Sequence, residues 1–245
     1  MRFAAIADIH GNALALEAVL ADIRAQGISD IVNLGDHLSG PLESGRTADI
    51  LLGLDLPSVL GNHDRYLIEL DAGAMHEWET DALAELTPAH LDWLRNQPPT
   101  LVWRDDVFLC HATPDDDNRY WLEGVSPEGH VHLKPLAEIE ALATGIGQSL
   151  ILCGHSHLPR AVTLSDGRLI VNPGSVGCPA YDDITPYYHR VEAGTPFAAY
   201  AVLETSGDGW LPTFRQVAYD HASMAALAAS KHRRDWSRGL ATGWL

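Results

Sequence analysis

The sequence is poor in basic residues and in cysteine. It has 16 lysines and arginines against 33 acidic residues, and its formal net charge is −17 at pH 7. Proteins that bind duplex nucleic acid contact its phosphates through lysine and arginine, so this balance argues against a nucleic-acid partner. The three cysteines, Cys110, Cys153 and Cys178, form no Cys-x-x-Cys pair. We expect all three to be reduced, with Cys110 and Cys153 buried at the ends of apolar runs.

Long apolar segments are absent as well. No stretch approaches the ~20 apolar residues of a membrane span. The N-terminus has no basic segment followed by an apolar region, which a signal peptide would need. We therefore expect a cytoplasmic protein without a membrane span. With no internal repeat or low-complexity linker, residues 1–245 are expected to form one domain.

Short apolar runs alternate with helical patterns in the first half of the chain. Strands are expected at Phe3–Ala7, Ile31–Leu34 and Ser58–Leu60, and helices at Asn12–Gln26 and Thr47–Leu54. In the first helix the apolar residues recur at helical spacing, which gives it one face to pack on a sheet. This alternation predicts parallel strands covered by helices.

The rest of the chain adds helices and late strands, and we expect an α/β (α+β) fold with two mixed β-sheets packed between helices. The segment Pro114–Glu128, rich in Asp, Pro and Gly, is expected to be an active-site loop. The further helices are predicted at Asp64–Leu70, Thr80–Leu86, Pro88–Asn96, Leu133–Ala143 and His221–Lys231. The further strands are predicted at Leu101–Trp103, Val107–Cys110, Leu150–Cys153, Ala161–Leu164, Leu169–Val171, Ala198–Leu203 and Thr213–Ala218.

Five polar signals each follow an apolar strand. They are Asp8-Ile9-His10, Gly35-Asp36, Gly61-Asn62-His63-Asp64, His111 and Gly154-His155-Ser156-His157. Ligand sites in α/β proteins gather at the carboxyl ends of strands, so we expect these side chains to converge.

The donor atoms in these signals suit a metal centre. Carboxylate, amide and imidazole donors fit Mn, Fe or Zn, and the lack of thiolates disfavours a structural zinc site. Asp8 and His10 are expected on the same side of an extended segment, because side chains alternate there. The single carboxylate of Asp36 can bridge two cations ~3.5–4 Å apart. Each signal alone also has a structural explanation, such as a core histidine for His111 or a turn for Gly61–Asp64, but their common order predicts a two-metal site.

In this order the signals resemble the motifs of the calcineurin-like metallophosphoesterases, especially the small bacterial and archaeal phosphodiesterase-like branch. The resemblance extends from Met1 to Gly177 and includes Asn172–Gly177. It implies a four-layer αββα sandwich that binds two divalent or trivalent metal ions. It also implies that one metal is held by Asp8, His10 and His157, the other by Asn62, His111 and His155, and that Asp36 is shared.

The resemblance also implies a mechanism. His63 matches the residue thought to protonate the leaving group. We hypothesise that the metals lower the pKa of a bridging water, so that hydroxide attacks phosphorus. Ser39 and Gly40 stand where the protein phosphatases of this superfamily have an Asp-Arg pair. The lack of an arginine clamp there favours phosphodiester or nucleotide-type substrates over phosphoproteins, unless Arg119 or Arg160 supplies the charge from elsewhere.

A second set of residues has equally balanced interpretations. Asn118 and Arg119 either contact substrate or lie in a solvated loop, and Gly174 and Ser175 either offer backbone N–H groups to it or turn the chain. Asp64 either orients a histidine or caps a helix.

His37 is expected to point away from the site, because neighbouring side chains of an extended segment face opposite sides. We expect pocket walls from Pro114–Glu128 and from Tyr181–Ala193.

Three other functions are compatible with these motifs. One is a broad phosphomonoesterase, including phosphoprotein phosphatase activity, with the same site. Another is a non-catalytic scaffold, as in the retromer subunit of this superfamily, but that subunit lacks the catalytic histidine and this chain has His63. A metal-dependent nuclease is disfavoured by the net charge of −17. We expect a small phosphate-ester substrate, while the metals bound and the oligomeric state stay open.

Overall fold

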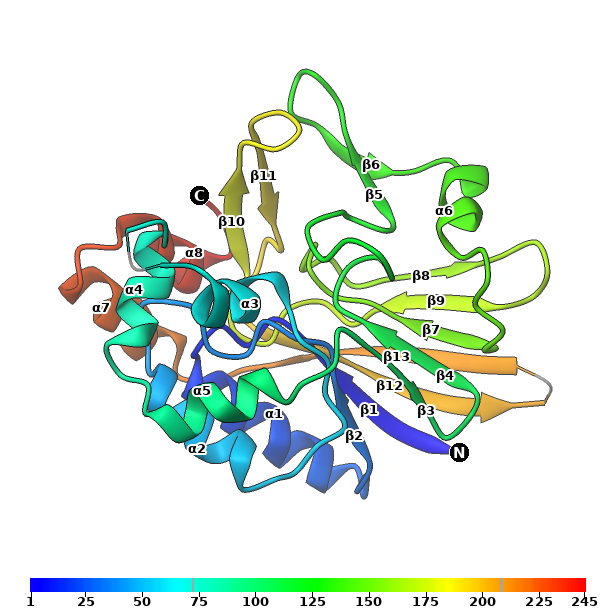
Figure 1. Ribbon diagram of the computed structural model, residues 1–245, viewed down its shortest axis with the longest axis horizontal. Coiled ribbons are helices and arrows are strands. Elements are labelled where there is room, and N and C mark those ends of the chain that lie inside the picture. The colour runs from blue at the N-terminus through cyan, green and yellow to red at the C-terminus, as the bar shows by residue number, and fades with distance from the viewer. Residues whose placement is uncertain (72, 208) are drawn as a thin grey trace.

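Two β-sheets lie face to face and helices cover their outer faces in the computed structural model, which describes residues 1–71, 73–207 and 209–245 (Figure 1). This is the expected four-layer arrangement. The first sheet has the order β13-β12-β1-β2 and the second the order β3-β4-β7-β9-β8. Both sheets are mixed, since each contains parallel and antiparallel pairs.

The parallel strands of both sheets have their carboxyl ends in the same region of the molecule. In the first sheet β1 (Arg2–Ile6) runs parallel to β2 (Ile31–Asn33), and in the second β4 (Val107–Cys110), β7 (Leu150–Leu152) and β9 (Leu169–Asn172) run parallel. The antiparallel members are β12 (Ala198–Ser206), β13 (Gly209–Val217), β3 (Thr100–Trp103) and β8 (Arg160–Thr163).

The core between the sheets follows from the period-two alternation of strand side chains. In β1, Phe3 and Ala5 face the second sheet, whereas Ala4 and Ile6 face the helices. Because both faces of β1 are buried, its consecutive residues are all apolar from Phe3 to Ile6. The sheet-to-sheet core is made of Phe3, Ala5, Ala7, Val32, Leu34, Val59, Ala201 and Leu203 against Val107, Leu109, Leu150, Leu152, Leu169 and Val171.

Helices cover the first sheet more fully than the second. The apolar face of α1 (Ala13–Ala25) packs on the first sheet, with Asn12 as its N-cap and Gly27, at φ 69°, just after its end. Further helices beside it are α2 (Ser44–Leu52), α3 (Asn62–Glu69), α4 (Glu77–Leu83) and α5 (Pro88–Arg95). The second sheet is covered by α6 (Leu136–Leu142) together with Trp121. Among the described residues, no helix combines the length and the apolar character of a membrane span.

Several local predictions were wrong. Ser58–Leu60 is not a strand and forms only one bridge, between Asn33 and Ser58. The helix predicted at Leu133–Ala143 begins only at Leu136, because Leu133 pairs with Glu123 in a hairpin and Pro135 follows it. The helix predicted to begin at Thr80 begins at Glu77.

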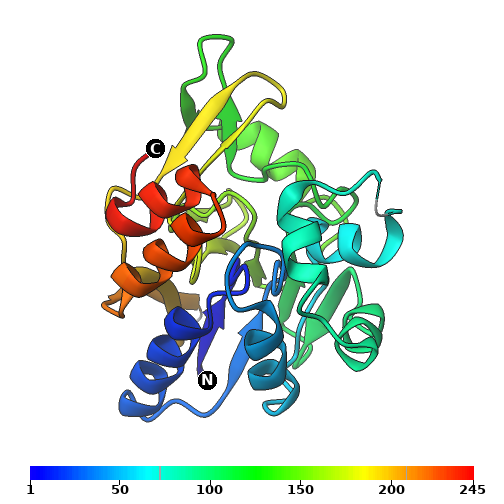
Figure 2. The same cartoon turned by 90° about the vertical axis from the view of Figure 1, so that its left-hand side faces the viewer.

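The helix predicted at His221–Lys231 is present as α7 (His221–Ser230), but two hairpins and the last helix, α8 (Arg234–Thr242), had not been predicted. The hairpins are β5 (Glu123–Val125) with β6 (Val131–Leu133), and β10 (Ala180–Asp183) with β11 (His189–Glu192), and both project from the same end of the molecule (Figure 1). Helix α8 packs on α7; α7 also lies beside α1, and α8 lies beside β10 (Figure 2).

Candidate metal centre

The seven residues predicted as metal ligands lie together where the two sheets meet. Asp8 and His10 follow β1, Asp36 follows β2, Asn62 begins α3, His111 follows β4, and His155 and His157 follow β7. Six of them form two groups of donors, Asp8–His10–His157 and Asp36–His111–His155. The donor atoms within each group lie within 4.8 Å of one another.

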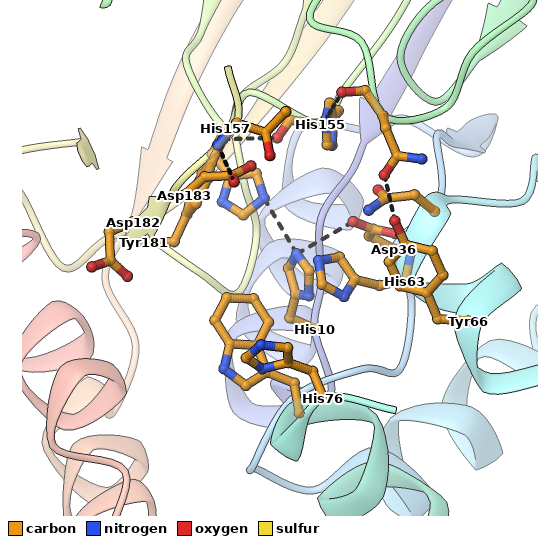
Figure 3. A pocket seen from close by; sticks show the side chains of 14 residues that line it. His10, Asp36, His63, Tyr66, His76, His155, His157, Tyr181, Asp182 and Asp183 are labelled. Carbon is orange, nitrogen blue, oxygen red and sulfur yellow. Dashed lines mark hydrogen bonds and ion pairs between the residues drawn. The ribbon is translucent and has the colours of Figure 1, made fainter. Parts of the chain in front are cut away.

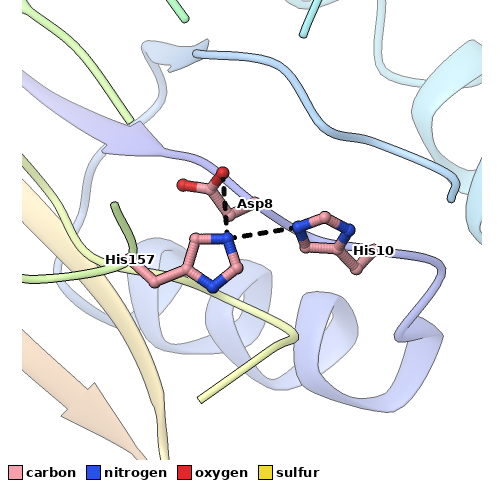
Figure 4. Close-up of side chains that lie close together, drawn as sticks. All are labelled: Asp8, His10 and His157. Carbon is pink, nitrogen blue, oxygen red and sulfur yellow. Dashed lines mark hydrogen bonds and ion pairs between the residues drawn. The ribbon is translucent and has the colours of Figure 1, made fainter. Parts of the chain in front are cut away.

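The first group brings three donor atoms to one point (Figure 4). Nε2 of His10 lies 3.2 Å from Nε2 of His157, which in turn lies 3.4 Å from Oδ1 of Asp8. All three side chains are buried.

In the second group, Nε2 of His111 faces two oxygens. It lies 3.0 Å from Oδ1 of Asn62 and 3.2 Å from Oδ2 of Asp36. The amide oxygen of Asn62 therefore lies beside this group.

Backbone carbonyls fix the tautomers of these histidines. Nδ1 of His10, His111 and His157 lies 2.9, 2.8 and 2.8 Å from the carbonyls of Ser39, Leu34 and Cys178. A carbonyl only accepts hydrogen bonds, so each Nδ1 carries the proton and each neutral ring directs its Nε2 lone pair inward. The Nε2 atoms of His10 and His157 then face each other; burial opposes charge on His157, but the adjacent Asp8 outweighs it and raises the pKa of His157, so this space attracts a proton or a metal ion.

His155 is oriented in the opposite sense. Its Nε2 donates to the carbonyl of Asn118 at 3.1 Å, which leaves Nδ1 as the free nitrogen. Carbonyls that orient ligand imidazoles in this way are typical of metal sites.

The carboxylate of Asp36 lies between the two groups. Its Oδ2 is 3.2 Å from Nε2 of His111 and 3.7 Å from Nε2 of His10. Within the described chain this oxygen is buried and has no hydrogen-bond donor, whereas Oδ1 accepts from the N–H of His63 at 3.0 Å. An unpaired buried carboxylate oxygen is costly, so its position fits a shared metal ligand.

Burial and neighbouring charges set the protonation of the site. Burial lowers the pKa of His10 to about 4 and that of His155 to about 3, so both rings are neutral at neutral pH. Burial also opposes charge on His111, but the adjacent Asp36 outweighs it and raises the pKa of His111 to about 9. For Asp36, burial is outweighed by His111 and His63, and its pKa lies well below the usual range. The space between Asp36 and His111 thus attracts positive charge, whether a proton or a metal ion.

The backbone at the ligands differs from the sequence expectation. Asp8 and His10 are not in an extended segment, because β1 ends at Ile6 and their φ angles are 55° and 50°. Asp36, His155 and His157 are also left-handed, with φ of 54°, 67° and 56°. The side chains converge through these left-handed residues and not through strand alternation.

His63 is held by a buried carboxylate that the sequence analysis missed. Oε1 of Glu79 lies 2.6 Å from Nδ1 of His63 and accepts a 2.8 Å hydrogen bond from Oγ of Ser39. Glu79 is only 1% exposed. Burial opposes charge on His63, but Asp36 and Glu79 together raise its pKa. The ring of Trp78 stacks on His63 at 5.2 Å.

A cavity of about 440 Å³ opens onto both donor groups (Figure 3). Of the predicted walls, the Pro114–Glu128 loop contributes Asn118, and the Tyr181–Ala193 segment contributes Tyr181 to Asp183 and Thr185. Tyr66, His76 and Trp78 had not been predicted, because they belong to none of the five motifs. The complete lining is His10, Asp36, Asn62, His63, Tyr66, His76, Trp78, Asn118, His155, His157, Tyr181, Asp182, Asp183 and Thr185.

The other candidate residues lie outside this lining. Arg119 is exposed, and Arg160 pairs with Glu123 at 3.0 Å. Gly174 and Ser175 lie behind the site, where Oγ of Ser175 donates to the carbonyl of Asp8 at 2.8 Å.

Asp64 has both of the roles that were left open. It accepts from the N–H of Gly61 at the start of α3 and from Nδ1 of His37 at 2.6 Å. His37 is fully buried and does not line the cavity.

Known proteins share both the sequence pattern and the fold. The family described as the calcineurin-like phosphoesterase superfamily domain matches residues 1–195. The crystal structure of a metallophosphoesterase from Sphaerobacter thermophilus has a TM-score of 0.76 at 25% identity, covering 99% of this chain and 100% of that chain. An uncharacterised protein of Methanocaldococcus jannaschii is 29% identical over 198 residues, 72% of this chain and 76% of that protein.

A more distant match carries a functional name. A Hamiltonella defensa protein named bis(5'-nucleosyl)-tetraphosphatase, symmetrical, is 36% identical over 118 residues, 44% of this chain and 42% of that protein. The chain thus matches less than half the length of this relative.

Proposed function

Because the chain belongs to the calcineurin-like phosphoesterase superfamily and is a phosphoric ester hydrolase, we propose that it is a dinuclear-metal-dependent phosphodiesterase that acts on small substrates. The observation that carries this proposal is the buried Oδ2 of Asp36, which has no hydrogen-bond donor among the described residues and lies between two groups of imidazole donors. A single metal ion would leave one of these groups without a cation.

Each metal has a complete set of donors. Asp8, His10 and His157 would hold one ion, Asn62, His111 and His155 the other, and Asp36 would contact both. This imidazole-rich set favours Mn, Fe or Zn over Mg or Ca. Bound ions would supply Lewis acidity toward phosphoryl oxygens and make water acidic enough to ionise near neutral pH.

His63 is the proton donor to the leaving oxygen in this proposal. Glu79 holds Nδ1, so Nε2 is the nitrogen left for the substrate, and His63 lines the cavity. For a diester with an alkyl leaving group, which needs a proton to depart, His63→Asn should lower kcat by about 10²- to 10⁴-fold, the usual contribution of a general acid. Metal content, measured by elemental analysis, should stay at the wild-type value, as it should in the exposed control His232→Asn. Wild-type turnover in His63→Asn would remove this residue from the mechanism.

The cavity supports a diester over a monoester. Within the described lining, no lysine or arginine is present to neutralise the second charge of a phosphomonoester. Ser39, at the place of the missing Asp-Arg pair, is buried and bound to Glu79.

A chromogenic assay tests the proposed function. The protein, purified without chelator and supplied with Mn²⁺, should cleave bis-p-nitrophenyl phosphate with a higher kcat/KM than p-nitrophenyl phosphate. EDTA should abolish both activities and Mn²⁺ should restore them. A preference for the monoester would instead support the broad phosphomonoesterase.

A further inference from the structure

The walls of the cavity have an unusual charge for a phosphate-ester site. Apart from the donor groups and the histidines, the only charged side chains in the described lining are the carboxylates of Asp182 and Asp183. A substrate with several phosphates would have no guanidinium or ammonium group to neutralise it there.

Arg119, next to the lining residue Asn118, is exposed and does not line the cavity, and two other arginines, Arg65 and Arg160, are engaged in ion pairs. Arg65, over the ring of Tyr66, donates two hydrogen bonds of 2.7 Å to Asp117. Arg160 is paired with the buried Glu123. Recruiting either arginine for a polyanionic substrate would break a pair that is partly shielded from water.

On one side of the cavity, hydrogen bonds hold the ring of Tyr181 and the carboxylate of Asp183 in place. The hydroxyl of Tyr181 lies 2.6 Å from that of Tyr120 and donates to the carbonyl of His155 at 3.2 Å. Two residues along β10, Asp183 is on the same side of the strand and accepts from the N–H of Thr185 at 2.9 Å. In Figure 3, Tyr181, Asp182 and Asp183 lie on one side, opposite Tyr66.

An aromatic ring beside a carboxylate recognises organic cations, because both attract positive charge. The cavity lining also includes the rings of Tyr66 and Trp78. We propose that the preferred substrates are small monoanionic phosphodiesters in which one esterified alcohol carries an ammonium group, bound between Tyr181 and Asp183. This inference rests on the proposed phosphodiesterase function.

Two substrates with the same leaving group provide the test. p-Nitrophenyl phosphorylcholine and p-nitrophenyl neohexyl phosphate have nearly the same shape, and only the first carries a positive charge. For the wild-type protein with Mn²⁺, kcat/KM should be about tenfold higher for the choline ester. In Asp183→Asn the ratio of the two kcat/KM values should fall toward one, whereas the remote exposed control Asp105→Asn should keep the wild-type ratio.

A ligand measurement covers the case in which Asp183→Asn does not fold. Tetramethylammonium chloride should competitively inhibit cleavage of the choline ester by the wild-type protein, whereas sodium chloride at equal ionic strength should not. A wild-type ratio near one, or a ratio unchanged in a folded Asp183→Asn, overturns the inference while the phosphodiesterase function stands. If bis-p-nitrophenyl phosphate and both other diesters resist cleavage, the phosphodiesterase function fails and this inference fails with it.

Discussion

Five of the seven proposed ligands have left-handed backbone angles, although none is glycine. Such a residue costs on the order of 1–3 kcal/mol. Around Asp8 and His10 this cost is offset by hydrogen bonds, because the N–H groups of Ile9 and His10 donate to the carbonyl of Asp36 at 2.9 and 3.0 Å. The N–H of His155 donates to both carboxylate oxygens of Asp8 at 3.2 Å. The ligand loops therefore hold one another in a strained arrangement that favours metal binding.

Gly61 leaves the space that the shared carboxylate occupies. A Cβ atom at this position would overlap Oδ1 and the backbone N of Asp36. Gly61→Ala should displace Asp36 and weaken metal binding by roughly 10- to 100-fold, as loss of supporting contacts does in other metal sites. Titration with Mn²⁺ by calorimetry measures the change. Gly147→Ala, where a Cβ would meet no atom within 4 Å, should bind Mn²⁺ normally.

Glu79 should affect catalysis through His63 without touching the substrate. Glu79→Gln removes the charge that favours protonated His63 and should lower kcat by roughly 10- to 100-fold for alkyl diesters, part of a general acid's contribution. For p-nitrophenyl diesters the loss should be smaller, because nitrophenolate departs with little protonation. Equal losses with both leaving groups would indicate a structural role. Glu77→Gln, an exposed position on the same helix, is the matched control.

At the scale of elements, the spacing of apolar residues predicted the helices and strands that bury a regular apolar face in the core. The apolar face of α1 and the apolar runs of β1, β4 and β7 were located correctly, because burial alone determines their pattern. Helix α4 begins three residues before the predicted Thr80, and Glu79 in its first turn is buried against His63. The spacing of residues within this segment cannot predict a contact between Glu79 and His63, which belongs to a different helix.

The hairpin β10–β11 was missed for a related reason. Its short strands carry Asp182 and Asp183 and lack a clear apolar alternation. Packing of α8 against β10 and the contact of Tyr181 with Tyr120 help to define it, and both involve distant parts of the chain. The five motifs predicted the donor groups, but the cavity wall that governs specificity depends on these long-range contacts.

A polar connection ties α1 to the first sheet. Asp22 accepts 2.7 Å hydrogen bonds from Tyr200 of β12 and Arg215 of β13, and its pKa is lowered chiefly by the bonds from Arg215. Because the folded pKa lies below the unfolded one, this stabilisation is present above the unfolded pKa of about 4 and is lost as pH falls through the folded value. Asp22→Asn should therefore lower the free energy of unfolding by about 1–2 kcal/mol at neutral pH.

Urea unfolding at decreasing pH measures this contribution. The difference between wild type and Asp22→Asn should shrink as the solution becomes more acidic than about pH 4. Asp92→Asn removes an aspartate from an exposed pair with Arg95 and should change the unfolding midpoint little. A difference independent of pH would show that the charge of Asp22 does not contribute.

At the scale of the whole molecule, the proposed metal centre joins the two sheets. Asp8, His10 and Asp36 follow strands of the first sheet, while His111, His155 and His157 follow strands of the second. A metal ion held by Asp8, His10 and His157 therefore connects both sheets, and so does one held by Asp36, His111 and His155. Binding that requires both sheets in place stabilises the folded chain as a unit.

Thermal unfolding should accordingly depend on metal. Free Mn²⁺ at about 100 times its Kd should add about 2.7 kcal/mol of stability, which corresponds to roughly 5–10 °C in Tm for a chain of this size. EDTA should reverse the shift. Ca²⁺, which prefers oxygen ligands, should raise Tm far less, because four of the seven proposed donors are imidazoles. Equal stabilisation by Ca²⁺ and Mn²⁺ would point to the acidic surface and not to this centre, since surface carboxylates do not distinguish the two ions through imidazole nitrogen.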